Sequence, residues 1–344
     1  MTTMAAGLPA LDRARRQVEP ELRAAVARLD PDNRAIAAYH LGWTEADGTA
    51  RTASGGKAVR PAMALLAAEA GGAPAEAGLA AAVAVELVHN FSLIHDDVMD
   101  GDLERRHRPT VWALWGIPAA VLAGDALLVL AQDVLLAAGP AGPRAAALLG
   151  ASVAELIRGQ TEDLAFERRT WVSLEECRRM AAGKTGALLS ASARTGALLG
   201  GADPEVIAAL GCYGEHVGMA FQLVDDVLGI WGDPALTGKP VLSDLRARKK
   251  SLPVTYVLAQ HSDPARAATA HELADWLAAS GQPGEAELNR IATVIEDAGG
   301  RAWALAEAER EVGLAVRAVE SVPLADSARA ELIALTRYLT RRET

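Results

Sequence analysis

Two groups of aspartates interrupt long apolar stretches of this 344-residue chain. The first is Asp96, Asp97 and Asp100, and the second is Asp225 and Asp226. Carboxylates in such surroundings are partly desolvated, and those one helical turn apart repel one another, so a cation must offset the cost. Mg2+ typically uses one or two carboxylates together with substrate phosphates. Two such groups facing each other would make a metal-bridged diphosphate site.

Basic residues follow each acidic group. Arg105 and Arg106 come shortly after the first group, where guanidinium groups could bind a second anion in a forked geometry. Lys239 and Lys249 follow the second group, so that metal ligands and diphosphate donors occur in succession. The alternative in both places is an ordinary solvated, salt-bridged surface.

A glycine-containing turn precedes both groups. It reads Gly55-Gly56-Lys57-Ala58-Val59-Arg60-Pro61 and places two cations three residues apart at the start of a predicted helix. The N-terminus of a helix is a favourable place for an anion. A solvated basic turn is the alternative here.

The elements that must position these residues are helices. Apolar residues recur at i, i+3, i+4 and i+7, as in Leu79 to Met99 and Val206 to Ile230. Turn-forming clusters separate such stretches at 71–74, 139–143, 200–204, 281–284 and 299–300. No sustained alternating strand pattern and no dividing linker is evident. The sequence predicts one all-α domain over residues 1–344 with about ten or more helices. It also predicts a polar, basic loop from Gly232 to Leu252 and disorder at Thr2 to Ala6, with fraying at 341–344.

The overall composition limits the protein class. Hydrophobic residues make up 51% of the chain, and its net charge of -10 argues against a nucleic-acid surface. Cys177 and Cys212 are far apart, which provides neither a disulfide framework nor a zinc-binding spacing. The N-terminus lacks a signal-peptide pattern, and the most apolar run, 117–138, is interrupted by Asp125 and Asp133. We therefore expect a cytoplasmic protein without stable membrane insertion.

Six motifs in order resemble those of the trans-prenyltransferase family, also called polyprenyl synthetases. They are GGKxxRP at 55–61, DDxxD at 96–100 with RRxxPT at 105–110, GQxxD at 159–163, KTG at 184–186, FQxxDD at 221–226, and GKP with SDLxxxKK at 238–250. The resemblance implies an isoprenoid synthase-type helical bundle with a central cavity. It also implies that the protein is a homodimer that joins isopentenyl diphosphate to an allylic diphosphate with Mg2+.

The resemblance further implies a role for each matching residue. The Mg2+ ligands would be Asp96, Asp97, Asp100 and Asp225, with Asp226 in support. The allylic diphosphate would be held by Arg105, Lys184, Thr185, Gln222, Lys239 and Lys249. Isopentenyl diphosphate would be held by Gly56, Lys57, Arg60, His89 and Arg106. The catalytic residues would be Asp96, Asp97, Asp100, Asp225, Lys184 and Lys239, because ionising an allylic C–O bond requires neutralising the leaving diphosphate.

The sequence departs from the family pattern at two positions. Ala58 stands where many members have Arg, which implies weaker isopentenyl diphosphate binding. Gly229 replaces the last Asp of the second DDxxD, which questions the affinity of one metal position, although Asp233 could partly substitute. These departures keep a non-catalytic partner subunit open as an alternative. A class I terpene cyclase is another alternative, but the N-D-x-x-S-x-x-x-E pattern of that class is missing from the sequence.

Product length is expected to depend on the helix that carries the first acidic group. Phe91 and Ser92, five and four residues before Asp96, are the first candidates for the cavity wall, with Val88 a turn deeper. A lone aromatic there, in a DDxxD without insertion, resembles geranylgeranyl diphosphate synthases. The sequence thus predicts geranylgeranyl diphosphate as the main product, with farnesyl or a longer diphosphate as alternatives.

Several histidines have no place in these motifs. His40, His216, His261 and His271 are expected to be surface or hydrogen-bonded structural residues. His95 precedes the first acidic group and could either orient a carboxylate or serve packing.

Overall fold

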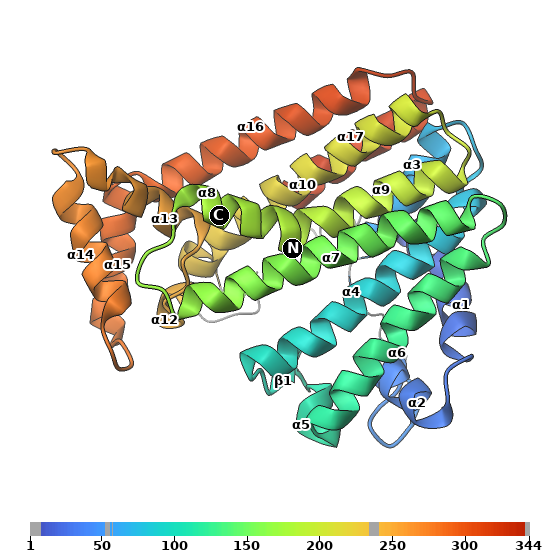
Figure 1. Cartoon of the computed structure of the whole chain (residues 1–344), viewed down its shortest axis with the longest axis horizontal. Coiled ribbons are helices and arrows are strands. Elements are labelled where there is room, and N and C mark those ends of the chain that lie inside the picture. The colour runs from blue at the N-terminus through green and yellow to red at the C-terminus, as the bar shows by residue number, and fades with distance from the viewer. Residues whose placement is uncertain (1–7, 52–55, 57, 234–240, 341–344) are drawn as a thin grey trace, which may run out of the picture. The chain divides into compact units, whose positions relative to one another are not determined.

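The computed structural model describes residues 8–51, 56, 58–233 and 241–340 (Figure 1). Apart from the two-residue strands β1 (Glu104–Arg105) and β2 (Arg108–Pro109), the named elements in this part of the chain are helical. The longer helices are α1 (Pro9–Val26), α2 (Pro31–His40), α3 (Val59–Ala70), α4 (Leu79–Asp100), α6 (Ile117–Leu136), α7 (Gly142–Glu167), α8 (Leu174–Ala181), α9 (Ala187–Leu199), α10 (Pro204–Trp231), α14 (Ala267–Ala278), α15 (Glu285–Asp297), α16 (Gly300–Glu320) and α17 (Asp326–Thr340). The short ones are η1 (Ala75–Gly78), α5 (Val111–Trp115), η2 (Ala182–Gly186), α12 (Ser243–Arg246), α13 (Leu252–Leu258) and η3 (Ala259–Ser262). The predicted all-α class is confirmed, and the predicted turn clusters separate consecutive helices.

The chain divides into two compact units. Unit 1 comprises Met1–Val153, Leu188–Gly211 and Val319–Leu335, and unit 2 comprises Ala154–Ala187, Cys212–Ala318 and Thr336–Thr344. The single domain expected over residues 1–344 stays a prediction. The segments expected to be disordered or frayed, 2–6 and 341–344, lie outside the described residues.

Unit 1 is built around α4, which packs against α3 and lies beside α6 (Figure 1). Small residues allow these helices to approach one another closely. At Gly124 of α6, an added Cβ would overlap the imidazole of His95 in α4. At Gly196 of α9, an added Cβ would overlap the carbonyl oxygen of Ala64 in α3. The high alanine and glycine content of the chain thus allows helix axes to lie close together, which fixes the position of α4.

Unit 2 has its own buried cores. One is formed by α10, α8 and α16, with Leu223, Val227 and Cys177 among its fully buried members. Another packs α13, α14 and α15 around Leu258 and Ile291. These cores hold the helices from which the second acidic group and the basic residues near it project.

The predicted loop from Gly232 to Leu252 is only partly a loop. Its described residues include α12, which begins after Leu242, a residue with a left-handed φ of 61°. The expectation was wrong there because Leu245 is fully buried in the core of unit 2, and this burial stabilises a helical turn within a polar sequence.

Two helical segments of the described chain are long and apolar enough to cross a membrane, Ala75–Asp100 and Val111–Leu136. Most of the first is buried inside the protein, whereas most of the second is exposed. Length and composition alone are weak grounds for a membrane span, because core helices of soluble proteins pass the same test. The expected lack of membrane insertion stays a prediction.

Candidate active site

The first acidic group occupies the last turn of α4, which ends at Gly101 with a left-handed φ of 70°. Asp97 is only 1% exposed, Asp96 is half-buried, and Asp100 is exposed. Asp97 Oδ1 accepts a hydrogen bond of 2.6 Å from Arg105 Nε, and its Oδ2 is enclosed without a partner among the described residues. Burial raises the pKa of Asp97 to about 6, against the opposing effect of Arg105. One oxygen of this aspartate is therefore committed to an arginine, and the other is left for a further ligand.

A strained hairpin presents the two arginines that follow. Its strands β1 and β2 pair antiparallel, with Arg105 opposite Arg108. The residues between them, Arg106 and His107, have φ values of 53° and 59°. These values match a type I′ hairpin turn, which requires positive φ at both central positions, where most residues other than glycine are disfavoured.

Backbone strain of this kind recurs beside the predicted motifs. The positive-φ residues other than glycine in the described chain are Ala58, Arg106, His107, Leu242 and Arg248. Ala58 caps α3 in the GGKxxRP motif, and the last two border α12 next to Lys249. Strained residues concentrate at functional sites, where the surrounding structure holds them in place.

Four of the residues predicted to bind isopentenyl diphosphate lie together in unit 1. A Cβ added at Gly56 would lie 3.0 Å from the guanidinium of Arg106, so glycine allows this arginine to approach the chain. Burial, followed by the charges of Arg60 and Arg106, lowers the pKa of His89 well below its usual value. Lys57, the fifth residue predicted for this substrate, lies outside the described residues.

Glu86 supplies the counter-charge in this part of unit 1. Burial raises its pKa, while Arg60 and Arg106 act in the opposite direction. Asn90 Nδ2 donates to the backbone oxygen of Glu86 at 2.8 Å and to its Oε1 at 3.2 Å. The Nε of Arg60 is enclosed without a hydrogen-bond partner in the described part of the chain. The arginines are thus only partly neutralised, as an anion-binding site requires.

The KTG motif of unit 2 lies on η2, a single π-helical turn between α8 and α9. Such turns are rare and frequently occur at functional sites. Lys184 Nζ lies 2.5 Å from Asp163 Oδ2 of the GQxxD motif. Thr185 Oγ1 donates to Gln222 Oε1 at 2.7 Å. This turn therefore joins three of the predicted motifs.

Gln222 connects this turn to the second acidic group. Its Nε2 donates to Asp226 Oδ1 at 2.7 Å, and Asp226 Oδ2 accepts from the backbone N–H of Leu252 at 2.9 Å. Burial raises the pKa of Asp226 to about 6, with Lys249 as the main opposing charge. Both oxygens of Asp226 thus have protein partners. Asp225 is the less buried carboxylate of the pair.

Lys249 lies among several carboxylates. Burial lowers its pKa, but Asp226, Asp244, Asp163 and Asp225 together raise it above the ordinary value. A lysine in this position stays charged. Lys239, the other lysine predicted for this region, lies outside the described residues.

Gly229, which replaces the last Asp of the second DDxxD, lies directly against the side chain of Asp244. A Cβ at this position would overlap the carboxylate of Asp244, whose Oδ1 would lie 2.7 Å away. Asp244 therefore occupies the space in which a side chain at position 229 would begin. Asp233, considered above as a substitute, is exposed beyond the end of α10.

The predicted chain-length residues lie on α4 in the core of unit 1. Val88 is fully buried, and Phe91 is nearly so, with its ring edge-on to His95 at a centroid distance of 4.8 Å. Ser92 Oγ donates to the backbone oxygen of His89 at 2.9 Å. His95 Nε2 lies 3.1 Å from the carbonyl oxygen of Val121 in α6, so this histidine packs against the neighbouring helix.

Comparison with known proteins identifies the family. A sequence model of the polyprenyl synthetase family matches residues 44–289. The chain belongs to this family. It is 51% identical to (2E,6E)-farnesyl diphosphate synthase of Mycobacterium tuberculosis over 98% of this chain and 93% of that protein. It is 42% identical to geranylgeranyl diphosphate synthase of the same species over 98% of this chain and 94% of that protein.

Solved structures agree with this assignment. A polyprenyl synthetase from Streptomyces coelicolor matches with a TM-score of 0.89 and 48% identity, over 97% of this chain and 99% of that one. A geranylgeranyl pyrophosphate synthase from Corynebacterium glutamicum, complexed with isoprenyl diphosphate and magnesium, matches with a TM-score of 0.81 and 27% identity, over 98% and 100%. This polyprenyl synthetase is a short-chain prenyl diphosphate synthase, and hence a prenyltransferase.

Members of this family use divalent metal ions, and the carboxylates present fit that requirement. Oxygen ligands are those that Mg2+ prefers. The described residues contain no cluster of three or more His, Cys, Asp or Glu side chains placed to hold a metal ion. In unit 1 the candidate ligands are Asp96 and Asp100 on α4, with the enclosed Oδ2 of Asp97 as a further acceptor. In unit 2 the candidate ligand is Asp225 on α10.

Sequence reasoning missed four residues of this polyprenyl synthetase that lie against the predicted ones. They are Glu86, Asp163, Asp244 and His40. Asp163 belongs to the GQxxD motif and Asp244 to the SDLxxxKK motif, and this membership could have identified both as candidate site residues. Glu86 lies one helical turn before Asn90 and belongs to none of the six motifs, so the sequence did not point to it. His40 was expected to be on the surface or fully hydrogen-bonded, but its Nε2 is enclosed without a partner among the described residues.

Proposed function

We propose that this enzyme condenses isopentenyl diphosphate with allylic diphosphates in a Mg2+-dependent reaction and that geranylgeranyl diphosphate is its main product. The observation that carries the proposal is the strained hairpin at the end of α4. It holds Arg105 against Asp97 and Arg106 against Gly56, beside the metal-ligand candidates. Strain at two adjacent residues costs free energy and tends to persist at functional sites. Here it would hold the arginines in a geometry suited to binding anions.

In this proposal the isopentenyl diphosphate is held by Gly56, Lys57, Arg60, His89 and Arg106. The allylic diphosphate is held by Arg105, Lys184, Thr185, Gln222, Lys239 and Lys249. Mg2+, when bound to Asp96, Asp97, Asp100 and Asp225, with Asp226 in support, supplies Lewis-acid neutralisation of the leaving diphosphate.

The side chains support ionisation of the allylic substrate. Lys184 and Lys249 place fixed positive charge where the allylic C–O bond breaks and the diphosphate leaves. Apolar residues such as Val88 and Phe91 exclude water from the resulting cation. The alkene of isopentenyl diphosphate then forms the new C–C bond, and the released diphosphate accepts the proton that is lost.

Farnesyl diphosphate is the second candidate product. It is favoured by the 51% identity to a farnesyl diphosphate synthase, against 42% to a geranylgeranyl diphosphate synthase. Geranylgeranyl diphosphate is favoured by the lone aromatic Phe91 with the small Ser92 beside it, because a second aromatic side chain there would shorten the cavity.

One assay tests the proposal. Purified protein is incubated with Mg2+, isopentenyl diphosphate and dimethylallyl, geranyl or farnesyl diphosphate in turn, and the products are sized by chromatography. We expect elongation to a twenty-carbon diphosphate, and accumulation at fifteen carbons would favour the farnesyl alternative. No elongation from any primer would contradict the catalytic proposal and favour a regulatory subunit.

We also propose that the enzyme acts as a homodimer in the cytoplasm. The support for a dimer is the apolar face of α6, where Leu122 is 61% and Val129 is 62% exposed. Apolar surface of this kind on a helix favours association with another protein surface. Cell fractionation tests the location, and the dimer is tested below.

A further inference from the structure

A cavity of about 240 Å3 in unit 1 contains a histidine that no motif includes. Its polar lining consists largely of Arg51, Arg105, Arg106 and Arg108, against the single carboxylate of Asp97. His40 lies in the same lining. Arg105 pairs with Asp97, whereas Arg51 and Arg108 both pair with Glu45 outside the lining. Among the described residues no salt bridge is formed by Arg106, so its guanidinium makes this cavity suited to an anion.

His40 is fixed in place by its neighbour Tyr39. The Tyr39 hydroxyl donates to the carbonyl oxygen of Pro109 at 2.8 Å, and Arg108 donates to the Tyr39 carbonyl at 2.8 Å. The Arg108 guanidinium also lies 3.9 Å from the centre of the Tyr39 ring. These contacts tie the end of α2 to the strained arginine hairpin, so His40 and Arg106 are held by the same local structure.

The ring of His40 has an unused polar atom. Its Nε2 is shielded from solvent and has no hydrogen-bond partner among the described residues. An enclosed ring nitrogen without a partner is costly, and such groups in native proteins call for a ligand, water or functional role.

The electrostatic surroundings link His40 to the isopentenyl diphosphate residues. Burial, together with the charges of Arg106, Arg105 and Arg108, lowers the pKa of His40 to about 3, and a side-chain hydrogen bond with Asn90 acts in the opposite direction. The pKa of His89 is in turn lowered by burial, by Arg60 and Arg106, and by His40 itself. The two imidazoles therefore lie near the same guanidinium, that of Arg106.

We propose that His40 is a second histidine of the isopentenyl diphosphate subsite and that its Nε2–H donates a hydrogen bond to a diphosphate oxygen there. This inference rests on the proposed function. His40 lies on α2 and belongs to none of the six motifs. It would contribute to the affinity for isopentenyl diphosphate. The diphosphate supplies the negative charge that the arginine-lined cavity lacks.

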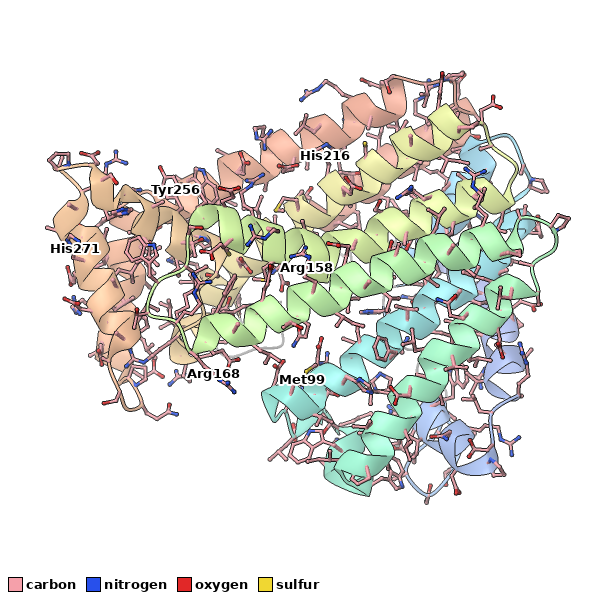
Figure 2. All side chains as sticks on the ribbon, viewed as in Figure 1. Met99, Arg158, Arg168, His216, Tyr256 and His271 are labelled. Carbon is pink, nitrogen blue, oxygen red and sulfur yellow. The ribbon has the colours of Figure 1, made fainter. Side chains whose placement is uncertain are left out.

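Two substitutions separate hydrogen bonding from packing. His40→Gln keeps an N–H donor near the position of Nε2, whereas His40→Leu keeps similar volume without a donor. His271→Gln on α14 is the matched control, because His271 is an exposed histidine of unit 2 (Figure 2).

The measurements are KM for isopentenyl diphosphate, KM for the allylic primer, and the melting temperature. We expect His40→Leu to raise KM for isopentenyl diphosphate about ten-fold or more, the usual cost of a lost hydrogen bond to a charged group. The KM for the allylic primer should stay within two-fold of wild type, and His40→Gln should recover most of the loss. A rise in the allylic KM alone, equal rises in both, or no change in a folded His40→Leu protein would overturn the assignment.

Calorimetric titration of isopentenyl diphosphate, with Mg2+ and without primer, tests the inference apart from catalysis. Weaker binding to His40→Leu than to wild type and His40→Gln supports the inference even if the wild type forms no product, a result that would reject only the proposed function. Equal binding by all three proteins, or no binding by the wild type, overturns the role of His40 whatever the turnover assay gives.

Discussion

Asp96 occupies the last turn of α4 with Asp100 one helical turn further on. In the proposed reaction these carboxylates contact diphosphate only through a cation, so Asp96→Ala should reduce turnover by orders of magnitude. Helix content measured by circular dichroism should remain unchanged, because residue 96 is half-buried near a helix end. Near-normal turnover by the folded variant would reject the metal assignment.

Substitutions at Gly229 should change the Mg2+ dependence of the enzyme, and the structure changes the expected direction. The sequence alone suggested that the missing Asp weakens one metal position, so that Gly229→Asp would strengthen it, but a side chain at this position would overlap the Asp244 carboxylate. Asp244 acts electrostatically on both Asp226 and Lys249, so its displacement should disturb the charge around the diphosphate. We expect Gly229→Ala and Gly229→Asp to raise the Mg2+ concentration needed for half-maximal rate.

The control for this experiment is Gly150→Ala in α7. A Cβ at Gly150 meets only Gln132 Nε2, at an ordinary 3.7 Å. This control should leave the Mg2+ dependence unchanged and should not destabilise the helix. If Gly229→Ala behaves like the control, the contact with Asp244 has no role in metal use.

Phe91 and Ser92 are the residues at which product length should respond. Phe91 is nearly buried against His95, so Phe91→Ala opens space deeper along α4 and should lengthen the product. Ser92→Phe adds an aromatic ring and should shorten it. Chromatographic sizing of the products checks both changes. An unchanged distribution for Phe91→Ala would mean that another helix forms the floor of the cavity.

At the scale of elements, α8 begins with a complete capping box that supports the π-helical turn carrying Lys184. Glu176 N–H donates to Ser173 Oγ, and the Glu176 carboxylate accepts from the Ser173 N–H and from Arg169. The Arg169 hydrogen bond is the largest effect holding the pKa of Glu176 at about 2, below its ordinary 4.5. The ionised carboxylate is thus preferred in the folded state.

Glu176→Gln keeps a side chain that can complete the capping box but removes the ion pair with Arg169, so it should destabilise the protein by about 0.5 kcal/mol at neutral pH. Because the folded-state pKa is depressed, this stabilisation is present above pH 4.5 and is lost as the pH falls toward 2. Urea unfolding of both proteins at a series of pH values measures the difference. A difference that stays constant between pH 5 and pH 2.5 would show that the carboxylate charge is not responsible.

At the scale of the whole molecule, the exposed apolar face of α6 should determine the oligomeric state. Leu122→Lys and Val129→Lys place charge on this face, and their double variant should shift a dimer to a monomer. Light scattering coupled to gel filtration measures the mass. Tyr338→Lys on α17, at an exposed apolar position of another helix, should leave the mass unchanged. A wild-type monomer, or a double variant that stays dimeric, contradicts this role of α6.

The sequence by itself determined the all-α class, the helix boundaries near glycine and proline clusters, and the family. These properties depend on local signals: helical periodicity, turn residues and motif spacing along the chain. The same signals located Asp97, Arg105, Lys184 and Asp226 in functional motifs. They could not show that one oxygen of Asp97 is committed to Arg105 or that Gln222 links Thr185 to Asp226.

Tertiary structure alone decided which further side chains lie beside the predicted ones. Glu86 became the counter-charge of Arg60 because α3 and α4 pack together. Asp244 filled the space left at Gly229 because α12 folds back onto α10. His40 joined the arginine cavity because Tyr39 is tied to the hairpin 69 and 70 residues further along the chain. Burial and Coulomb interactions depend on distance in space, and no spacing along one sequence encodes these distances.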